Sequence, residues 1–78
     1  MPVAHREGPY RIHFYSYDCE EPPHVHVQRD RNEAKFWLAP VEVADDGGFA
    51  GHELRTIRRI IIRNLDKIME RWYEHCGS

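Results

Sequence analysis

The sequence has few of the features that place a small chain in a specialised class. It contains only two cysteines, Cys19 and Cys76, in 78 residues. That is too few for the disulfide framework of a small secreted domain, so we expect two free thiols. No apolar run approaches the roughly 18 residues of a membrane span, and residues 1–10 lack the apolar stretch of a secretory signal. The sequence therefore predicts a cytoplasmic protein that has no contact with a membrane.

The chain also lacks a large excess of charge of either sign. It has 11 Lys and Arg against 13 Asp and Glu, a formal net charge of −2, which argues against bulk electrostatic binding to nucleic acid. The charges are uneven, because residues 1–48 carry nine acidic and five basic side chains, whereas residues 49–78 carry four and six. With 41% hydrophobic and 31% charged residues, the composition predicts one globular domain over residues 1–78.

Alternating apolar and polar residues predict strands at 10–15, 24–28 and 33–38. Residues 41–43, after Pro40, are a candidate for a short fourth strand at the edge of this sheet. A helical pattern follows over about 51–75, with Ala50 as a weak N-cap and Gly77 as the stop. The predicted fold class is α+β: a three- to four-stranded antiparallel sheet with one long C-terminal helix packed on one face.

The alternation assigns side chains to the two faces of this sheet. We expect the helix to cover one face with a single apolar stripe, Leu54, Ile57, Ile61, Leu65, Ile68 and Trp72. The covered strand residues would be Ile12, Phe14, Val25, Val27, Ala34, Phe36 and Leu38. The other face is expected to be open to solvent, and it would carry Arg11, His13, Tyr15, His24, His26, Gln28, Glu33, Lys35 and Trp37.

A hairpin register with Gln28 opposite Glu33 would place His26 across from Lys35 and His24 across from Trp37. An indole beside imidazoles on a solvent face is typical of a binding surface. An alternative is that Trp and Tyr are present because strands favour them. The predicted binding residues are Tyr15, His24, His26, Lys35 and Trp37.

The pair His24 and His26 projects to one side of a strand, a spacing that can chelate zinc. A third ligand would come from His13, Asp18, Cys19 or Glu20. We nevertheless predict no cofactor and no resident metal, and we name His24 and His26 as the candidate ligands if an ion binds. The same imidazoles, with Lys35 holding a phosphate, could act as acid and base in RNA cleavage. The catalytic candidates are therefore His24, His26 and Lys35.

The helix has a second feature of interest, a basic flank formed by Arg55, Arg59, Arg63 and Lys67. Such a flank is either a solvated face or a contact for phosphate or an acidic partner. Ile60, Ile62 and Tyr73 widen the apolar arc, which would suit a second packing partner or a homodimer.

Several segments together resemble domain-of-unknown-function family 4160 over about residues 8–76. They are Phe14-Tyr15-Ser16, Glu21-Pro-Pro-His-Val-His-Val27, Ala34-Lys-Phe-Trp-Leu38, Pro40-Val41, Gly48-Phe49, Glu53-Leu54 and the late Trp72. The resemblance implies a small, mostly bacterial protein, often encoded beside another small protein in a toxin–antitoxin-like arrangement. It directs attention to His24, His26, Lys35 and Trp37. The chain departs from the family at Ala50, where a Ser-type cap is usual, and at His13, where an aromatic or apolar residue is expected.

Three functions remain open on these grounds. The first is an interaction module, one component of a toxin–antitoxin-like pair with a small protein partner encoded nearby. The second is a small ribonuclease-type enzyme, and the third is a nucleic-acid-binding domain in which Trp37 and Tyr15 stack on bases. The interaction module is the leading prediction, so the sequence favours a protein that is not an enzyme without excluding the other two functions.

Overall fold

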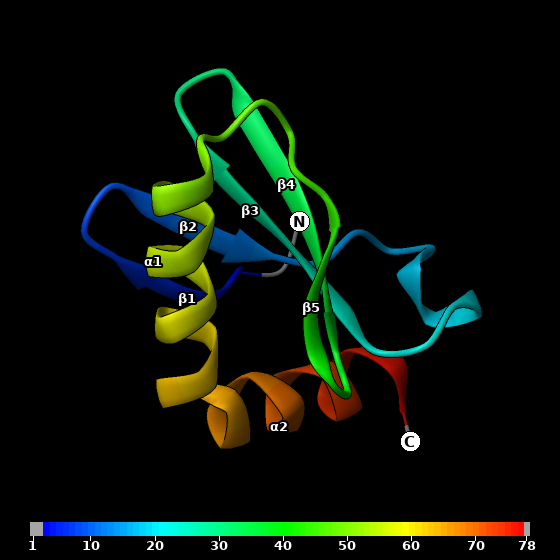
Figure 1. Cartoon of the computed structure of the whole chain (residues 1–78). Helices are drawn as coiled ribbons and strands as arrows, with labels where there is room; N and C mark the ends of the chain where they lie inside the picture. The colour runs from blue at the N-terminus through cyan, green and yellow to red at the C-terminus, as the bar shows by residue number, and fades with distance from the viewer. Residues whose placement is uncertain (1–2, 78) are drawn as a thin grey trace.

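The computed structural model describes residues 3–77, which form one antiparallel five-stranded sheet and two helices (Figure 1). The strands neighbour one another in chain order, from β1 to β5, so the sheet is a meander. No helix among these residues is long and apolar enough to cross a membrane. The elements are β1 (Val3–Glu7), β2 (Tyr10–His13), the short 3₁₀ helix η1 (Asp18–Glu20), β3 (His24–Arg29), β4 (Asn32–Leu38), β5 (Val41–Asp45), α1 (Gly51–Arg63) and α2 (Leu65–Cys76).

The fold class α+β with an antiparallel sheet is confirmed, but the predicted number of strands is wrong. The additional strand is β1, which pairs with β2 from Val3 opposite His13 to Glu7 opposite Tyr10. Its sequence gave little signal, because Ala4 is its only fully buried side chain and three of its five residues are His, Arg or Glu. Pairing with β2, rather than an alternating pattern of its own, makes this segment a strand.

The register of the central hairpin is the predicted one. His24 lies opposite Trp37, His26 opposite Lys35 and Gln28 opposite Glu33. The seven residues assigned to the covered face are all buried. Strand β2 ends at His13, two residues earlier than predicted, so Tyr15 belongs to the loop that follows.

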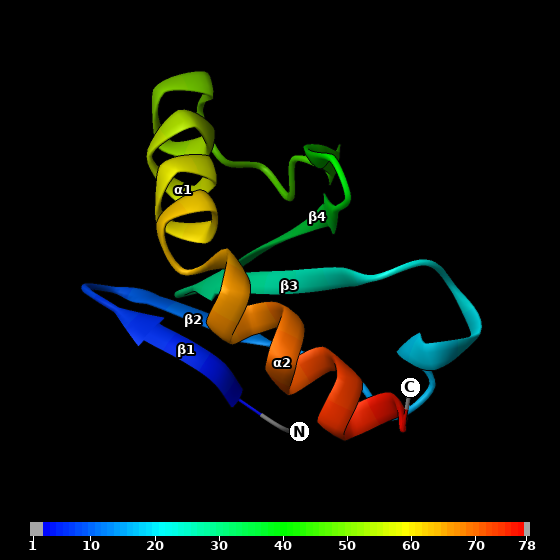
Figure 2. The same cartoon turned by 90° about the horizontal axis from the view of Figure 1, so that it is seen from below.

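The predicted single helix is two helices that meet at Asn64. The Asn64 side chain donates to the Ile60 carbonyl at 2.8 Å and also contacts Glu7 on β1. An amide side chain that competes for a backbone carbonyl in this way favours a break. The break lets α1 pack on β5 while α2 packs on β1, and the two helices run in different directions (Figures 1 and 2).

The ends and the apolar stripe of the helical region agree with the sequence analysis. Ala50 is the N-cap in an extended conformation, without a side-chain capping bond among the described residues, and Gly77 ends α2 at φ 76°. Along the stripe, Ile57, Ile61, Ile68 and Trp72 are buried. Leu54 and Leu65 are partly buried against the same core.

The expectation of two free thiols is wrong. Cys19 and Cys76 form a disulfide that joins η1 to the last residue of α2, with their Cα atoms 5.5 Å apart. The two cysteines are 57 residues apart in sequence, so only the tertiary fold brings them together. Cytoplasmic localisation stays a prediction, and it loses the support that free thiols would have given.

Candidate functional site

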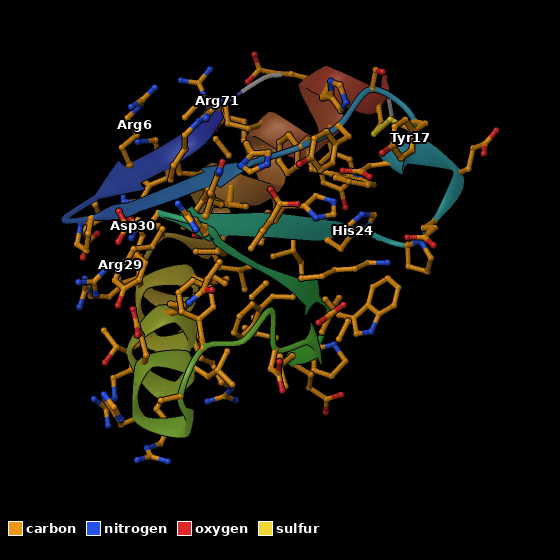
Figure 3. The ribbon with its side chains drawn as sticks, turned by 90° about the horizontal axis from the view of Figure 1, so that it is seen from above. Arg6, Tyr17, His24, Arg29, Asp30 and Arg71 are labelled. Atoms are coloured by element: carbon orange, nitrogen blue, oxygen red, sulfur yellow. A yellow bond between two sulfur atoms is a disulfide. The ribbon has the colours of Figure 1, made fainter. Side chains whose placement is uncertain are left out.

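Polar side chains that alternate with the core residues of β2, β3 and β4 form a compact cluster at one end of the sheet. Figure 3 shows His24 at the end of β3 that adjoins the loop carrying Tyr17. That loop, residues 14–23, folds against the ends of β2 and β3. The histidine cluster consists of His13, Tyr15, Asp18, His24, His26 and Glu33, contributed by β2, the loop, β3 and β4.

Asp18 lies at the centre of the histidine cluster and is only 4% exposed. Its Oδ1 is 3.1 Å from His24 Nε2, and its Oδ2 is 3.2 Å from His26 Nε2. The Tyr15 backbone N–H donates to Oδ2 at 2.7 Å. Burial raises the pKa of the Asp18 carboxyl, but the Tyr15 amide and the two imidazoles outweigh burial, so the pKa lies below its usual value. Asp18 is therefore a buried carboxylate.

His24 is not on an open surface, contrary to the prediction, because its side chain is only 1% exposed. The imidazole lies between two indoles, with ring centres 5.6 Å from Trp37 and 5.5 Å from Trp72. Its Nδ1 is 2.9 Å from the Pro22 carbonyl oxygen. The alternation correctly assigned the side of the sheet, but it contained no information about the loop that closes this end of it.

His13, also predicted to be solvent-facing, is fully buried as well. Its ring stacks on His26 at 5.8 Å and meets Tyr15 edge-on at 5.1 Å. Burial lowers the pKa of His13, and the nearby Glu33 offsets only part of that effect. His13 is thus held neutral at the bottom of the cluster.

Tyr15 and Glu33 form the outer wall of the histidine cluster. The Tyr15 hydroxyl donates to both carboxylate oxygens of Glu33, at 2.8 and 2.9 Å. Burial, together with the adjacent Glu33 carboxylate, raises the pKa of Tyr15 to about 12. Glu33 Oε2 is also 4.0 Å from His26 Nδ1. The ring of His26 therefore has a carboxylate on each side, Asp18 at one nitrogen and Glu33 at the other.

Lys35 points away from the imidazoles even though it is opposite His26 in the register. Its ammonium donates to Glu21 Oε1 at 2.7 Å and lies 4.5 Å from the centre of the Trp37 ring. The hydrogen bond from Lys35 is the main reason why the pKa of Glu21 lies below its usual value. The cationic group thus belongs to the Trp37 side of the site rather than to the histidine cluster.

Trp37 is partly buried and lines a shallow hollow of about 230 Å³ next to the cluster. We call the residues that line it the Trp37 surface: Pro22, Pro23, Trp37, Ala39, Pro40 and Glu42. The hollow is largely apolar, and three of its six residues are prolines.

The structure brings the five predicted binding residues together, but it does not make them equally accessible. The distance between ring centres is 4.6 Å for Tyr15 and His26, and 5.2 Å for His26 and His24. Of the three catalytic candidates, His24 is sealed from solvent, whereas the side chains of His26 and Lys35 are 14% and 24% exposed. An acid or base must reach the proton that it transfers, so only His26 and Lys35 are placed to meet a substrate.

Sequence reasoning gave too little weight to Asp18. It appeared there as one of four possible third ligands, whereas in the structure it contacts both histidines. Its position in a loop six residues before His24 gave no signal of this contact, because the loop conformation decides it. His75 also packs inward, with its ring on Phe14 and its Nε2 3.0 Å from the Tyr15 carbonyl oxygen.

The basic flank of the helical region is partly used within the molecule. Arg63 pairs with Glu7 on β1, and Lys67 Nζ lies 3.2 Å from His5 Nδ1. Beside this flank, Arg58 donates to the Val41 carbonyl at 3.0 Å. These contacts favour a structural role for this flank over a phosphate-binding one.

A family model described as "Domain of unknown function (DUF4160)" matches residues 10–73. The chain belongs to this family. The DUF4160 match includes the whole histidine cluster and the Trp37 surface, and it begins after β1. No curated protein and no solved structure matches the chain.

Proposed function

We propose that this DUF4160 protein is a small interaction module, one component of a toxin–antitoxin-like pair, which binds a partner protein through the Trp37 surface. The pairing with a neighbouring gene product is what the resemblance to the family implies. The choice of surface rests on the observation below.

The observation that carries the proposal is a partly buried indole in an apolar, proline-rich hollow of about 230 Å³. Trp is among the residues that most often dominate binding energy, because a rigid ring offers a large contact area at a small entropic cost. Proline side chains are rigid as well, so this surface loses little conformational freedom when it is covered. Neither Trp37 nor the prolines are among the buried core residues.

The charges around the hollow favour a basic partner segment. Glu42 lines the hollow, and Glu20 and Glu21 are exposed in the chain next to Pro22. Lys35, whose ammonium lies over the Trp37 ring, is already paired with Glu21. We therefore expect an extended segment that presents Lys or Arg beside apolar side chains. The same carboxylates would repel phosphate, which disfavours nucleic acid at this surface.

The test compares the wild-type protein with Trp37→Ala and with Tyr73→Ala, a matched loss of an exposed aromatic ring on α2. Each tagged protein is incubated with the purified product of the neighbouring gene, and the dissociation constant is measured by calorimetry. We expect Trp37→Ala to weaken binding by about 2 kcal/mol or more, roughly 30-fold. Tyr73→Ala should bind as the wild type does.

Equal binding by the wild type and Trp37→Ala would rule out the Trp37 surface, and no binding of the purified neighbour would rule out the pairing. Nuclease treatment of both proteins beforehand separates protein contact from contact bridged by RNA or DNA. RNA cleavage that is lost in His26→Gln would support the ribonuclease alternative instead.

A further inference from the structure

Three side chains of the histidine cluster offer donor atoms that converge on one point. One atom each from Asp18, His24 and His26 lies within 4.8 Å of the other two. Measured to one oxygen, Asp18 Oδ1, Nε2 of His24 lies at 3.1 Å and Nε2 of His26 at 3.4 Å, the second contact having the geometry of a hydrogen bond. A tetrahedral zinc ion with bonds of about 2.0–2.2 Å keeps its ligand atoms about 3.3–3.6 Å apart. The donor spacing is therefore that of a metal site.

The buried imidazole of His24 gives a second, independent indication. A carbonyl oxygen only accepts hydrogen bonds, so the 2.9 Å contact with Pro22 places a proton on His24 Nδ1. In the neutral ring, Nε2 then carries a lone pair. This atom is buried and has no hydrogen-bond partner among residues 3–77, although Asp18 Oδ1 is only 3.1 Å away. The distance is short, but the direction is not that of a hydrogen bond.

Such a misaligned contact is expected when two ligands point at a shared ion rather than at each other. A lone pair held against a carboxylate is repulsive unless a cation lies between them. A second proton on His24 would be the other way to remove the repulsion, and the experiment below distinguishes the two.

The surroundings of the three ligands match those of metal-binding histidines. Such histidines usually donate their second ring N–H to a carbonyl or a carboxylate, which fixes the ring and the tautomer. His24 has the Pro22 carbonyl in that position, and His26 Nδ1 faces Glu33 at 4.0 Å. Glu33 is itself held by the Tyr15 hydroxyl. The Pro22 carbonyl therefore fixes the His24 ring before any ion binds, whereas Glu33 lies beyond hydrogen-bond distance of His26 Nδ1.

Charge at the site is also suited to a divalent ion. Two neutral imidazoles and the Asp18 carboxylate leave one positive charge on a bound divalent ion. Glu21 Oε1 lies 3.7 Å from His24 Nε2, and the same oxygen accepts from the Lys35 ammonium at 2.7 Å, so this ion pair adds no net charge beside the ligands. The Lys35 ammonium, which would oppose an ion, is turned toward Glu21 and Trp37.

We infer that Asp18, His24 and His26 bind one divalent transition-metal ion, with Zn²⁺ as the ion that this nitrogen and oxygen set suits best. The ion would join η1 to β3. Three protein ligands leave a fourth position for water.

The experiment measures zinc binding to the oxidised protein after removal of metal with a chelator. Calorimetry with Zn²⁺ and the visible absorption bands of four-coordinate Co²⁺ report affinity and ligand geometry. We expect one ion per chain in the wild type. Loss of a direct ligand in Asp18→Asn or His26→Gln should weaken binding by more than about 100-fold, since even changes in supporting residues cost 10–100-fold. Circular dichroism establishes that both variants are folded.

Two matched variants exclude other donors. His52→Gln removes an exposed histidine from α1 and should bind zinc as the wild type does. His75→Gln tests the second group of donors, Cys19, His75 and Cys76, whose two sulfurs are joined in the disulfide, and it should also keep its zinc. Wild-type affinity in Asp18→Asn and His26→Gln, or no saturable binding by the wild type, would overturn the inference and leave protonated His24 as the explanation.

Discussion

The two faces of the sheet are shielded from solvent by different parts of the chain. On one face, apolar side chains such as Ile12, Val25 and Phe36 are covered by two helices. On the other, the polar side chains of the histidine cluster are closed at one end by residues 14–23 and by their own hydrogen bonds. Burial on the apolar face therefore follows from strand alternation, whereas burial on the polar face depends on one loop.

The two tryptophans beside His24 give the sharpest version of this comparison. Trp72 belongs to the helix face and is 4% exposed, whereas Trp37 belongs to the polar face and is partly exposed. We expect Trp72→Ala to lower the free energy of unfolding by about 3–5 kcal/mol. Trp37→Ala should cost clearly less, because its ring is only partly removed from water. Urea unfolding curves measure both, and equal losses would mean that Trp37 is as much a core residue as Trp72.

A second pair of neighbours tests the helix face alone. Ile61 is fully buried, and Ile62 is 46% exposed. Removing the buried side chain leaves a cavity, so Ile61→Ala should cost about 2–5 kcal/mol. Ile62→Ala should change stability by no more than about 0.5 kcal/mol, as is usual for surface positions. Thermal melting of both variants provides the check, and a reversed order would place the apolar stripe elsewhere.

The sequence predicts the features that depend on nearby residues and misses those that depend on distant contacts. Alternation and helical spacing correctly predicted the apolar face, the central register and both helix caps, because these depend on nearby residues. Strand β1, the break at Asn64 and the Cys19–Cys76 disulfide depend on contacts with distant segments. The site was found in outline, through Tyr15, His24, His26, Lys35 and Trp37. Its centre, Asp18, was named only as one of four possible third ligands, because no local pattern reports the path of the loop.

On the polar face, the loss of Asp18 should be the most damaging single change. Asp18→Ala leaves the His26 imidazole and the Tyr15 amide without their acceptor. A buried polar group without a partner costs about 1–3 kcal/mol. Unfolding is measured in the presence of a chelator, so that metal binding does not contribute. Stability unchanged within error would mean that the loop is not held by Asp18.

The smallest expected effect is a loss of stability at acidic pH. His13 is buried with a lowered pKa, so below about pH 6.5 the unfolded chain takes up a proton at His13 that the folded chain does not. Stability should therefore fall as the pH drops from 7.5 to 5.5, and the loss should stop below the lowered pKa. Replacing His13 with Phe removes this proton and should flatten the slope, whereas His52→Gln should leave it unchanged. An equal slope in His13→Phe would assign the acid sensitivity to another group.

The central claim is that the polar face holds a built site around Asp18 rather than an open patch of histidines. Imidazole ¹⁵N spectra at pH 7.5 test it most directly, first with a chelator and then with one equivalent of Zn²⁺. The account predicts that His24 carries its proton on Nδ1 and is protected from exchange with water, and that zinc shifts Nε2 of His24 and His26 while leaving His52 unchanged. A His24 ring that exchanges tautomers freely and responds to zinc no more than His52 does would contradict it.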